Sequence, residues 1–416
     1  MKLLLALAAA LVTFVAALLL TTRGEETPAP PTAPAALAGV ERRIAPAGLG
    51  EHLDALQRIA DANGGNRAAG TAGERATADY LAGRLRAAGY RVSTQEVAVP
   101  SFRERRAPRL TAGSRTYTAR TLQYSGSGTA TGRVRSTAIG CTAAAFTALR
   151  DGEIALIQRG TCPFRQKVLA AQRAGAAAVL IADEAPVRGS LQRPGARIPV
   201  VAVGTDGAGL AGEEARVVVD AESSERRSPS VIAEAGAAGA ARVVMAGAHL
   251  DSVDEGPGLN DNGSGVAAVL EIAEELGGRR LPDGSALRFG FWGAEEIGLV
   301  GSTRYVQDLS RAERARIAAY VNLDMVGSPG AEPAIYDGDP AIAAALRRQL
   351  GEDAPRDDLG DSSDHAPFAA ANIPVGGLFT GLDKCYHRGC DTIDNVDRGV
   401  LTTSARAAGG ALVELM

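Results

Sequence analysis

The stretch RVVMAGAHLDSVDEGPGLNDNGSGVAAVLEIAEEL, residues 242–276, decides the fold. It begins with an apolar run that predicts a buried strand, residues 242–248, and ends with a segment that predicts a helix, residues 263–276. The loop between them is polar and rich in glycine, and it holds His249 and Asp261. An ordinary surface loop and a stiff loop carrying two metal ligands both fit this composition.

The alternation of strand and helix continues to the C-terminus. Further strands are expected at residues 286–294, 317–327 and 373–380, and a closing helix at 397–415. This pattern predicts an α/β fold class, with a mostly parallel mixed sheet flanked by helices. Ligands of such sheets bind at the carboxyl ends of the strands. The chemistry is therefore expected at that edge.

The domain organisation follows from length and texture. A chain of 416 residues is long enough for two or three units. Residues 103–228 contain short Thr/Val/Ser-rich strands, and then a strand, a Cys-containing turn, a helix and a second apolar strand within 152–184. We expect residues 103–228 to form a small β/α domain inserted into a discontinuous domain made of 46–102 and 229–416.

The N-terminus carries a targeting signal. Residues 3–20 are apolar except for Thr13 and follow Lys2, which predicts a secretory signal peptide or an uncleaved membrane anchor over residues 1–21. A Pro-rich spacer is expected over residues 22–45. Both readings place the folded part outside the cytoplasm.

The cysteines and the charge agree with an exported protein. The chain has four cysteines, Cys141, Cys162, Cys385 and Cys390, and an even count in such a protein suggests two disulfides. Pairing each cysteine with its neighbour in the sequence is preferred, and the other two connectivities stay open. The net charge is −4 without a Lys/Arg block, so nucleic acid is not expected as a partner.

Polar residues gather where the predicted strands end. They are His249, Asp251, Asp261, Glu295, Glu296, Asp324 and His387. Imidazole and carboxylate groups are the usual ligands of zinc when no thiolate is present, so this set suits two divalent ions. A bridging carboxylate such as Asp261 would hold two ions close together. Of the adjacent pair Glu295 and Glu296, one can bind metal while the other acts as general base.

Seven motifs in one order extend this reading to a family. They are HLDS (249–252), GLNDNGSG (258–265), WGAEEIGLVGS (292–302), NLDMVGS (322–328), SDHAPF (363–368), GGLFTG (376–381) and CYHRGCDT (385–392). Together they resemble the M28 family of co-catalytic zinc aminopeptidases, especially the secreted bacterial leucine-type enzymes. The inserted segment resembles a protease-associated (PA) domain.

The resemblance implies a metal-ligand set and two zinc ions per chain. One ion would have His249 and Asp324, the other Glu296 and His387, and Asp261 would bridge them. The remaining histidine of the motifs, in SDH, is expected to be structural, so it is left out of the ligand set.

The resemblance also implies roles beyond the ligands. Glu295 would be the base that deprotonates water, and Tyr386 would hydrogen-bond the oxyanion. Asp251 would hold the ring of His249, and Phe379 would line an apolar pocket for the first side chain of the substrate. The Cys385–Cys390 bridge would stiffen the loop that carries Tyr386 and His387.

The function expected from these residues is that of a secreted di-zinc aminopeptidase. It would remove N-terminal residues, hydrophobic and Leu-like, from peptides or proteins. The alternatives are an M28-like carboxypeptidase, a glutaminyl cyclase, and a non-catalytic PA-containing binding protein. A monomer is expected, with membrane contact only if the N-terminal helix is uncleaved.

Overall fold

The computed structural model describes residues 36–137, 139–336 and 338–416. The predicted signal or anchor, residues 1–21, and most of the spacer lie outside these residues. In the described part of the chain, no helix is both long and apolar enough to cross a membrane.

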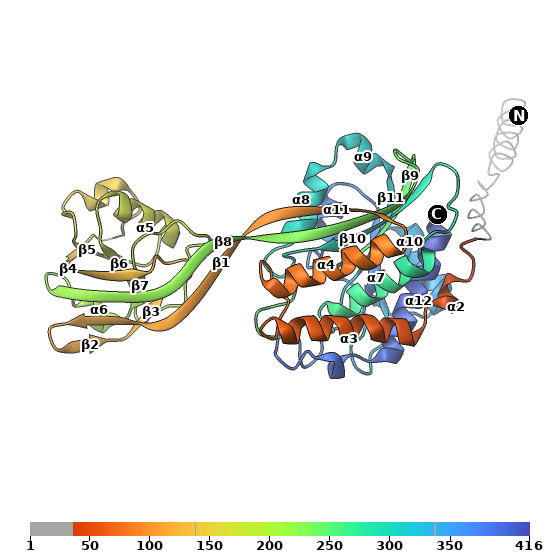
Figure 1. The fold of residues 1–416 in the computed structure, drawn as a ribbon. Helices are drawn as coiled ribbons and strands as arrows, with labels where there is room; N and C mark the ends of the chain where they lie inside the picture. The colour runs from red at the N-terminus through yellow and green to blue at the C-terminus, as the bar shows by residue number, and fades with distance from the viewer. Residues whose placement is uncertain (1–35, 138, 337) are drawn as a thin grey trace, which may run out of the picture.

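The described residues form two lobes joined by two long strands, β1 and β8 (Figure 1). The strands are β1 Arg91–Ala112, β2 Arg115–Tyr117, β3 Ala119–Thr121, β4 Gly128–Ser136, β5 Ile154–Gln158, β6 Ala178–Ala182, β7 Val200–Val203, β8 Glu214–Gly236, β9 Arg242–His249, β10 Ser285–Trp292, β11 Ile317–Leu323, β12 Ala334–Tyr336, β13 Arg356–Asp357 and β14 Val375–Phe379. The helices are α2 Val40–Arg43, α3 Pro46–Ala62, α4 Ala72–Ala87, α5 Phe164–Arg173, α6 Thr205–Ala208, α7 Gly263–Leu276, α8 Val300–Asp308, α9 Arg311–Arg316, α10 Pro340–Leu350, α11 His365–Ala370 and α12 Arg398–Leu415, with 3-10 turns at Ala143–Phe146 and Ile393–Asn395.

The larger lobe contains the sheet that the alternating pattern predicts. Its strand order is β13-β12-β14-β11-β9-β10-β8. The central strands β14, β11, β9 and β10 run parallel, and β8 and β12 join them antiparallel. The predicted α/β class with a mostly parallel mixed sheet is confirmed.

Helices cover both faces of this sheet because its central strands are apolar on both sides. In β9, Val244 and Ala246 belong to the core beneath α3, α4, α7 and α12. The alternate residues Val243 and Met245 face a second core with Trp292 and residues of α8 and α11. Two buried faces explain why β9 reads as a continuous apolar run.

The smaller lobe is a second sheet with its own core. Strands β4, β5, β6 and β7 pair in parallel, and β3 pairs antiparallel with β7. Two apolar clusters lie on the two faces of this sheet, and α5 packs on one of them. The Cys141–Cys162 disulfide, with an S–S distance of 2.06 Å, ties the loop before β5 to the turn before α5.

The expected domain limits fall inside continuous strands. Phe102 pairs with Ser223 and Arg103 with Glu222, so the chain enters and leaves the smaller lobe through neighbouring residues of the β1–β8 pair. The spacer also ends earlier than residue 45. Leu37 and Ile44 are at most 1% exposed within the core of the larger lobe, because their apolar side chains find a surface there.

Candidate active site

The parallel strands bring the polar residues to one edge of the larger sheet. His249 ends β9 and pairs with Trp292, the last residue of β10. Asp324 directly follows β11, which is parallel to β9. The Glu295–Glu296 pair follows β10 within a few residues. Side chains far apart in the sequence therefore meet at the carboxyl edge.

Asp261 lies between two histidines. Its Oδ1 is 3.4 Å from Nε2 of His249, and its Oδ2 is 3.3 Å from Nε2 of His387. Nε2 of His249 is also 3.4 Å from Oδ1 of Asp324, and Nε2 of His387 is 3.0 Å from Oε2 of Glu296. The structure thus brings all five expected ligands together and gives each oxygen of Asp261 its own histidine.

The cluster contains buried carboxylate oxygens that could bind cations. Asp261 Oδ2, Glu296 Oε1 and Asp324 Oδ1 are buried and make no hydrogen bond. Burial raises the pKa of Glu296 to about 7, and the adjacent carboxylates of Asp261 and Glu296 raise the pKa of His387 to about 10. Nitrogen and oxygen donors of His249, Asp261 and Glu296 lie within 4.8 Å of one another. This donor set fits zinc, which such histidines and carboxylates bind.

Asp251 contacts the backbone of the glutamate pair in addition to His249. Its carboxylate accepts hydrogen bonds from the backbone N–H of Glu295, at 3.1 Å, and of Glu296, at 3.3 Å. Its Oδ1 is 3.7 Å from Nδ1 of His249, whereas its backbone carbonyl is 3.2 Å from the same atom. Asp251 therefore positions the glutamate pair as well as the histidine ring.

Glu295 faces the cluster without belonging to its tightest contacts. Its Oε2 is 4.0 Å from Nε2 of His249. Burial, followed by the acidic neighbours Asp364 and Asp324, raises the pKa of Glu295 well above its ordinary value. A carboxylate whose affinity for a proton is raised in this way suits proton transfer near neutral pH.

The cluster forms the floor of a cavity of about 500 Å³. Met325, Leu359 and Phe379 give it an apolar wall, and Tyr386 lies at its rim. The ring of Tyr386 stacks on that of His387 at 3.8 Å between centroids. Burial raises the pKa of Tyr386 to about 12, so its hydroxyl remains a hydrogen-bond donor.

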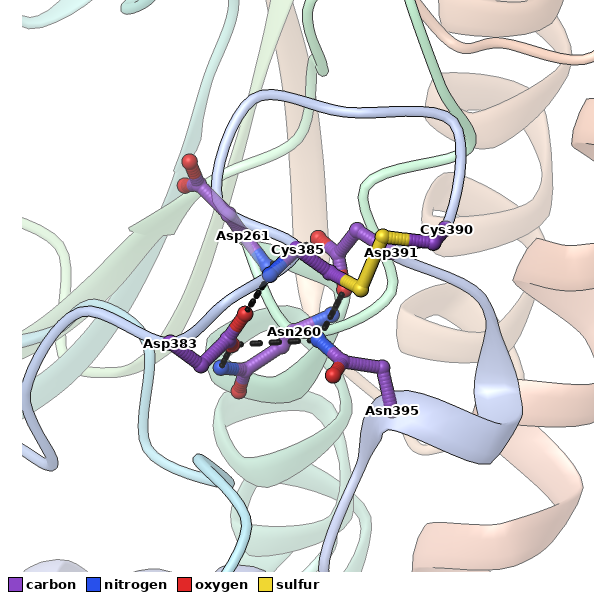
Figure 2. Close-up of a disulfide and its surroundings, with 7 residues drawn as sticks. All are labelled: Asn260, Asp261, Asp383, Cys385, Cys390, Asp391 and Asn395. Carbon is purple, nitrogen blue, oxygen red and sulfur yellow. Dashed lines mark hydrogen bonds between the residues drawn. A yellow bond between two sulfur atoms is a disulfide. The ribbon is translucent and has the colours of Figure 1, made fainter.

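The Cys385–Cys390 disulfide closes a small ring that contains Tyr386 and His387. Figure 2 shows the polar network beside it, which the sequence reasoning missed. The carboxylate of Asp391 accepts hydrogen bonds from the backbone N–H of Asn260 and of Asp261, each at 2.9 Å. The side chain of Asn395 donates to Asp391, at 3.0 Å. Asp391 therefore fixes the backbone from which Asp261 extends.

A second residue outside the expected set is Arg67, in the loop before α4. It is fully buried, and its guanidinium donates to the backbone carbonyls of Leu250, Pro257 and Gly258. These carbonyls belong to both ends of the loop between His249 and Asp261. Arg67 lies outside the seven motifs that resemble the family, so this role had no signal in the sequence.

The SDH motif contributes through its serine. Ser363 Oγ donates to Asp324 Oδ2 at 2.6 Å and so orients that carboxylate. His365 points elsewhere: its Nε2 is 2.8 Å from the carbonyl oxygen of Gly360.

Comparisons with known proteins identify the family. The model for "Peptidase family M28" matches residues 230–411, and the model for the PA domain matches residues 128–212. The chain is 37% identical to "Probable lipoprotein aminopeptidase LpqL" of Mycobacterium tuberculosis, over 87% of this chain and 83% of that protein. The chain belongs to peptidase family M28.

Two further relatives of this M28 peptidase are informative. "Probable leucine aminopeptidase 2" of Aspergillus fumigatus is 34% identical over 83% of this chain and 78% of that protein. The structure of BSAP, described as a zinc aminopeptidase from Bacillus subtilis, superposes with a TM-score of 0.60 at 27% identity, over 87% of this chain and 93% of that one. The M28 peptidase thus shares its family and its fold with aminopeptidases and carries a PA domain.

Proposed function

We propose that this M28 aminopeptidase uses two zinc ions to remove hydrophobic, Leu-like residues from the N-termini of peptides outside the cytoplasm. The observation that carries the proposal is the position of Asp261, whose two carboxylate oxygens face two different histidines. A single ion could be bound through one oxygen of Asp261, whereas each oxygen here has a histidine of its own. A shared carboxylate between two imidazoles suits a pair of ions.

The ligands divide into two groups around Asp261. His249 and Asp324 would hold one zinc ion, and Glu296 and His387 would hold the other. When bound, the ions supply Lewis-acid polarisation of the scissile carbonyl and lower the pKa of water. The buried oxygens of Asp261, Glu296 and Asp324 that lack hydrogen bonds are the free donors that these ions need.

Glu295 and Tyr386 would carry the proton and the oxyanion. Glu295 takes the proton from the attacking water and delivers it to the leaving amine, a role that its raised pKa supports. The Tyr386 hydroxyl donates to the oxygen that becomes negative as the carbonyl is attacked. Its place at the cavity rim, against His387, supports this role.

The cavity accounts for the proposed substrate. Its wall of Met325, Leu359 and Phe379 would take an apolar first side chain, and Asp358 and Asp361, also in its lining, would attract a protonated α-amine. A relative named leucine aminopeptidase supports the same choice. Two disulfides support a location outside the cytoplasm, because such bonds persist in oxidising compartments.

The test compares Leu-p-nitroanilide with its N-acetylated form. We expect hydrolysis of the free amine only, loss of hydrolysis in chelator, and recovery with zinc. An enzyme that cleaves the blocked substrate equally well is not acting as an aminopeptidase.

The Glu295→Gln variant tests the base. It should lower kcat by about 10²–10⁴-fold while the zinc content stays unchanged. Glu255→Gln, on an exposed part of the 250–262 loop, is the matched control and should keep wild-type kcat. Wild-type turnover by Glu295→Gln would remove Glu295 from this role.

A further inference from the structure

The histidine that the active site does not use lies in the larger lobe, where α3, α4 and α7 meet. His52 is 0% exposed. Its Nδ1 is 2.8 Å from the hydroxyl of Tyr80 on α4, while its Nε2 is buried without a hydrogen-bond partner. A buried ring nitrogen without a partner costs free energy unless another group meets it.

Two carboxylates of α7 face this nitrogen. Nε2 of His52 is 3.4 Å from Oε2 of Glu271 and 3.7 Å from Oε2 of Glu274. These glutamates are three residues apart on the helix and so share one face. One ligand atom from each of the three residues lies within 4.8 Å of the other two.

The carboxylate of Glu271 is poorly compensated for its burial. It is 6% exposed, and it accepts a long hydrogen bond of 3.4 Å from the backbone N–H of Ala45. A Cβ atom added at Gly48 would lie 2.2 Å from Oε2 of Glu271, so the backbone of α3 closes directly over this carboxylate. Burying a charge without a partner costs several kcal/mol.

The nearby cation is already engaged. Arg84 donates to both oxygens of Glu274, at 2.6 and 2.7 Å, and also contacts Glu51. One guanidinium therefore faces two carboxylates, and none of its nitrogens approaches Glu271 among the described contacts. The space between His52 and Glu271 still needs a positive charge.

We propose that His52, Glu271 and Glu274 bind a divalent cation of the zinc class, separate from the active site. Two ligands of a tetrahedral zinc ion with bonds of about 2.0–2.1 Å lie roughly 3.3 Å apart, close to the 3.4 Å between His52 and Glu271. A metal-binding histidine donates the N–H of its other ring nitrogen to an outer acceptor, and here the Tyr80 oxygen would accept from Nδ1.

This site would be structural. Glu271 and Glu274 lie ten and thirteen residues beyond Asp261, or about 15–20 Å along a helix. A cation there would link α3 to α7. Helix α7 begins at Gly263, directly after the loop that carries Asp261. A substrate could not reach this site, because His52 and Glu271 are buried.

The test measures zinc per chain in the full-length protein, at free zinc buffered in the micromolar range. We expect His52→Gln to bind one zinc ion fewer than the wild type. Glu275→Gln is the matched control, because this neighbour on α7 pairs with Arg43 instead and should lose no zinc. Equal zinc content in the wild type and His52→Gln overturns the proposal and leaves a protonated His52 as the partner of Glu271.

A second variant keeps the result independent of the active site. Replacing both Asp261 and His387 by Ala should leave one zinc ion bound, and adding Glu271→Gln should remove it. If the Asp261→Ala/His387→Ala protein folds and binds no zinc, the proposed site at His52 is wrong, even if the wild-type active site binds two zinc ions. Failure of the di-zinc proposal would instead show as unchanged zinc content between the wild type and the Asp261→Ala/His387→Ala protein.

Discussion

Replacing Asp391 by Asn tests whether the backbone beneath Asp261 is held by charge. The substitution keeps the size of the side chain but changes one acceptor oxygen into an NH₂ donor. Asp391 accepts from the N–H of Asn260 and of Asp261, both at 2.9 Å, and is 2% exposed. An asparagine oxygen can keep one of these contacts, and the other N–H then faces a donor.

The cost follows from this mismatch. An unsatisfied buried donor costs about 1–3 kcal/mol, and the remaining bond loses its charge assistance. Removing a buried negative charge near Asp261 offsets part of the loss, since burial already raises the pKa of Asp391 to about 6. We expect the free energy of unfolding of the metal-free protein to fall by about 2 kcal/mol, and zinc affinity to fall roughly 10–100-fold.

Two measurements check this result. Urea unfolding in chelator gives the stability of the metal-free protein, and competition with a zinc-binding dye gives the affinity. Asp394→Asn is the control, because Asp394 is exposed only three residues away. Asp391→Asn that matches Asp394→Asn in both measurements would refute the view that this carboxylate positions Asp261.

Four further predictions follow from other parts of the molecule. Phe379→Ala should lower kcat/KM for Leu-p-nitroanilide by roughly 10–100-fold, because it removes apolar wall from the cavity, and steady-state kinetics will measure this. Replacing Cys385 and Cys390 by Ser should lower the free energy of unfolding by about 2 kcal/mol and reduce activity. The same change at Cys141 and Cys162, which close a longer loop, should lower it by about 3 kcal/mol and leave Leu-p-nitroanilide hydrolysis unchanged. Thermal unfolding and the chromogenic assay distinguish these two outcomes. Arg135 lowers the pKa of Glu153 from 4.5 to about 2 by hydrogen bonding, so this pair stabilises the smaller lobe above pH 4.5 and loses its effect as the pH falls towards 2; Arg135→Gln should flatten that part of the pH–stability curve. Joining Phe102 to Ser223 through a short turn removes the smaller lobe at a natural pairing position, and we expect activity on long peptides to change more than activity on the chromogenic substrate.

The site could be located from the sequence because the carboxyl ends of parallel strands lie at the same edge of a sheet. His249, Asp324 and the Glu295–Glu296 pair each follow an apolar strand, so their meeting could be expected before any coordinates were known. The fold class and the family were predicted for the same reason: apolar strands and ordered motifs leave a clear pattern.

The missed residues act through the backbone or through helix packing. Arg67 and Asp391 bind carbonyls and N–H groups, and such contacts leave no spacing rule in the sequence. His52 and Glu271 meet only because α3 and α7 pack together, and Glu271 and Glu274 resemble the solvated face of a helix. The long strand β1 is not among the predicted strands, because its outer half is polar and exposed and lacks the pattern of a half-buried strand.

The β1–β8 pair has a mechanical consequence. Between the lobes only these two strands cross in the described chain. Val97 and Val99 of β1 still pack on the larger lobe, whereas Phe102 already packs on the core of the smaller lobe. Just beyond the crossing, alongside the smaller lobe, ion pairs of Arg105 with Glu222 and of Arg106 with Asp220 link the strands, and the register shifts between Glu104 and Arg109. A ribbon one layer thick resists extension along its hydrogen-bonded strands but yields to bending and twisting. Relative motion of the two lobes should therefore be a swing at a fixed separation, which limits the smaller lobe to an arc around the larger one.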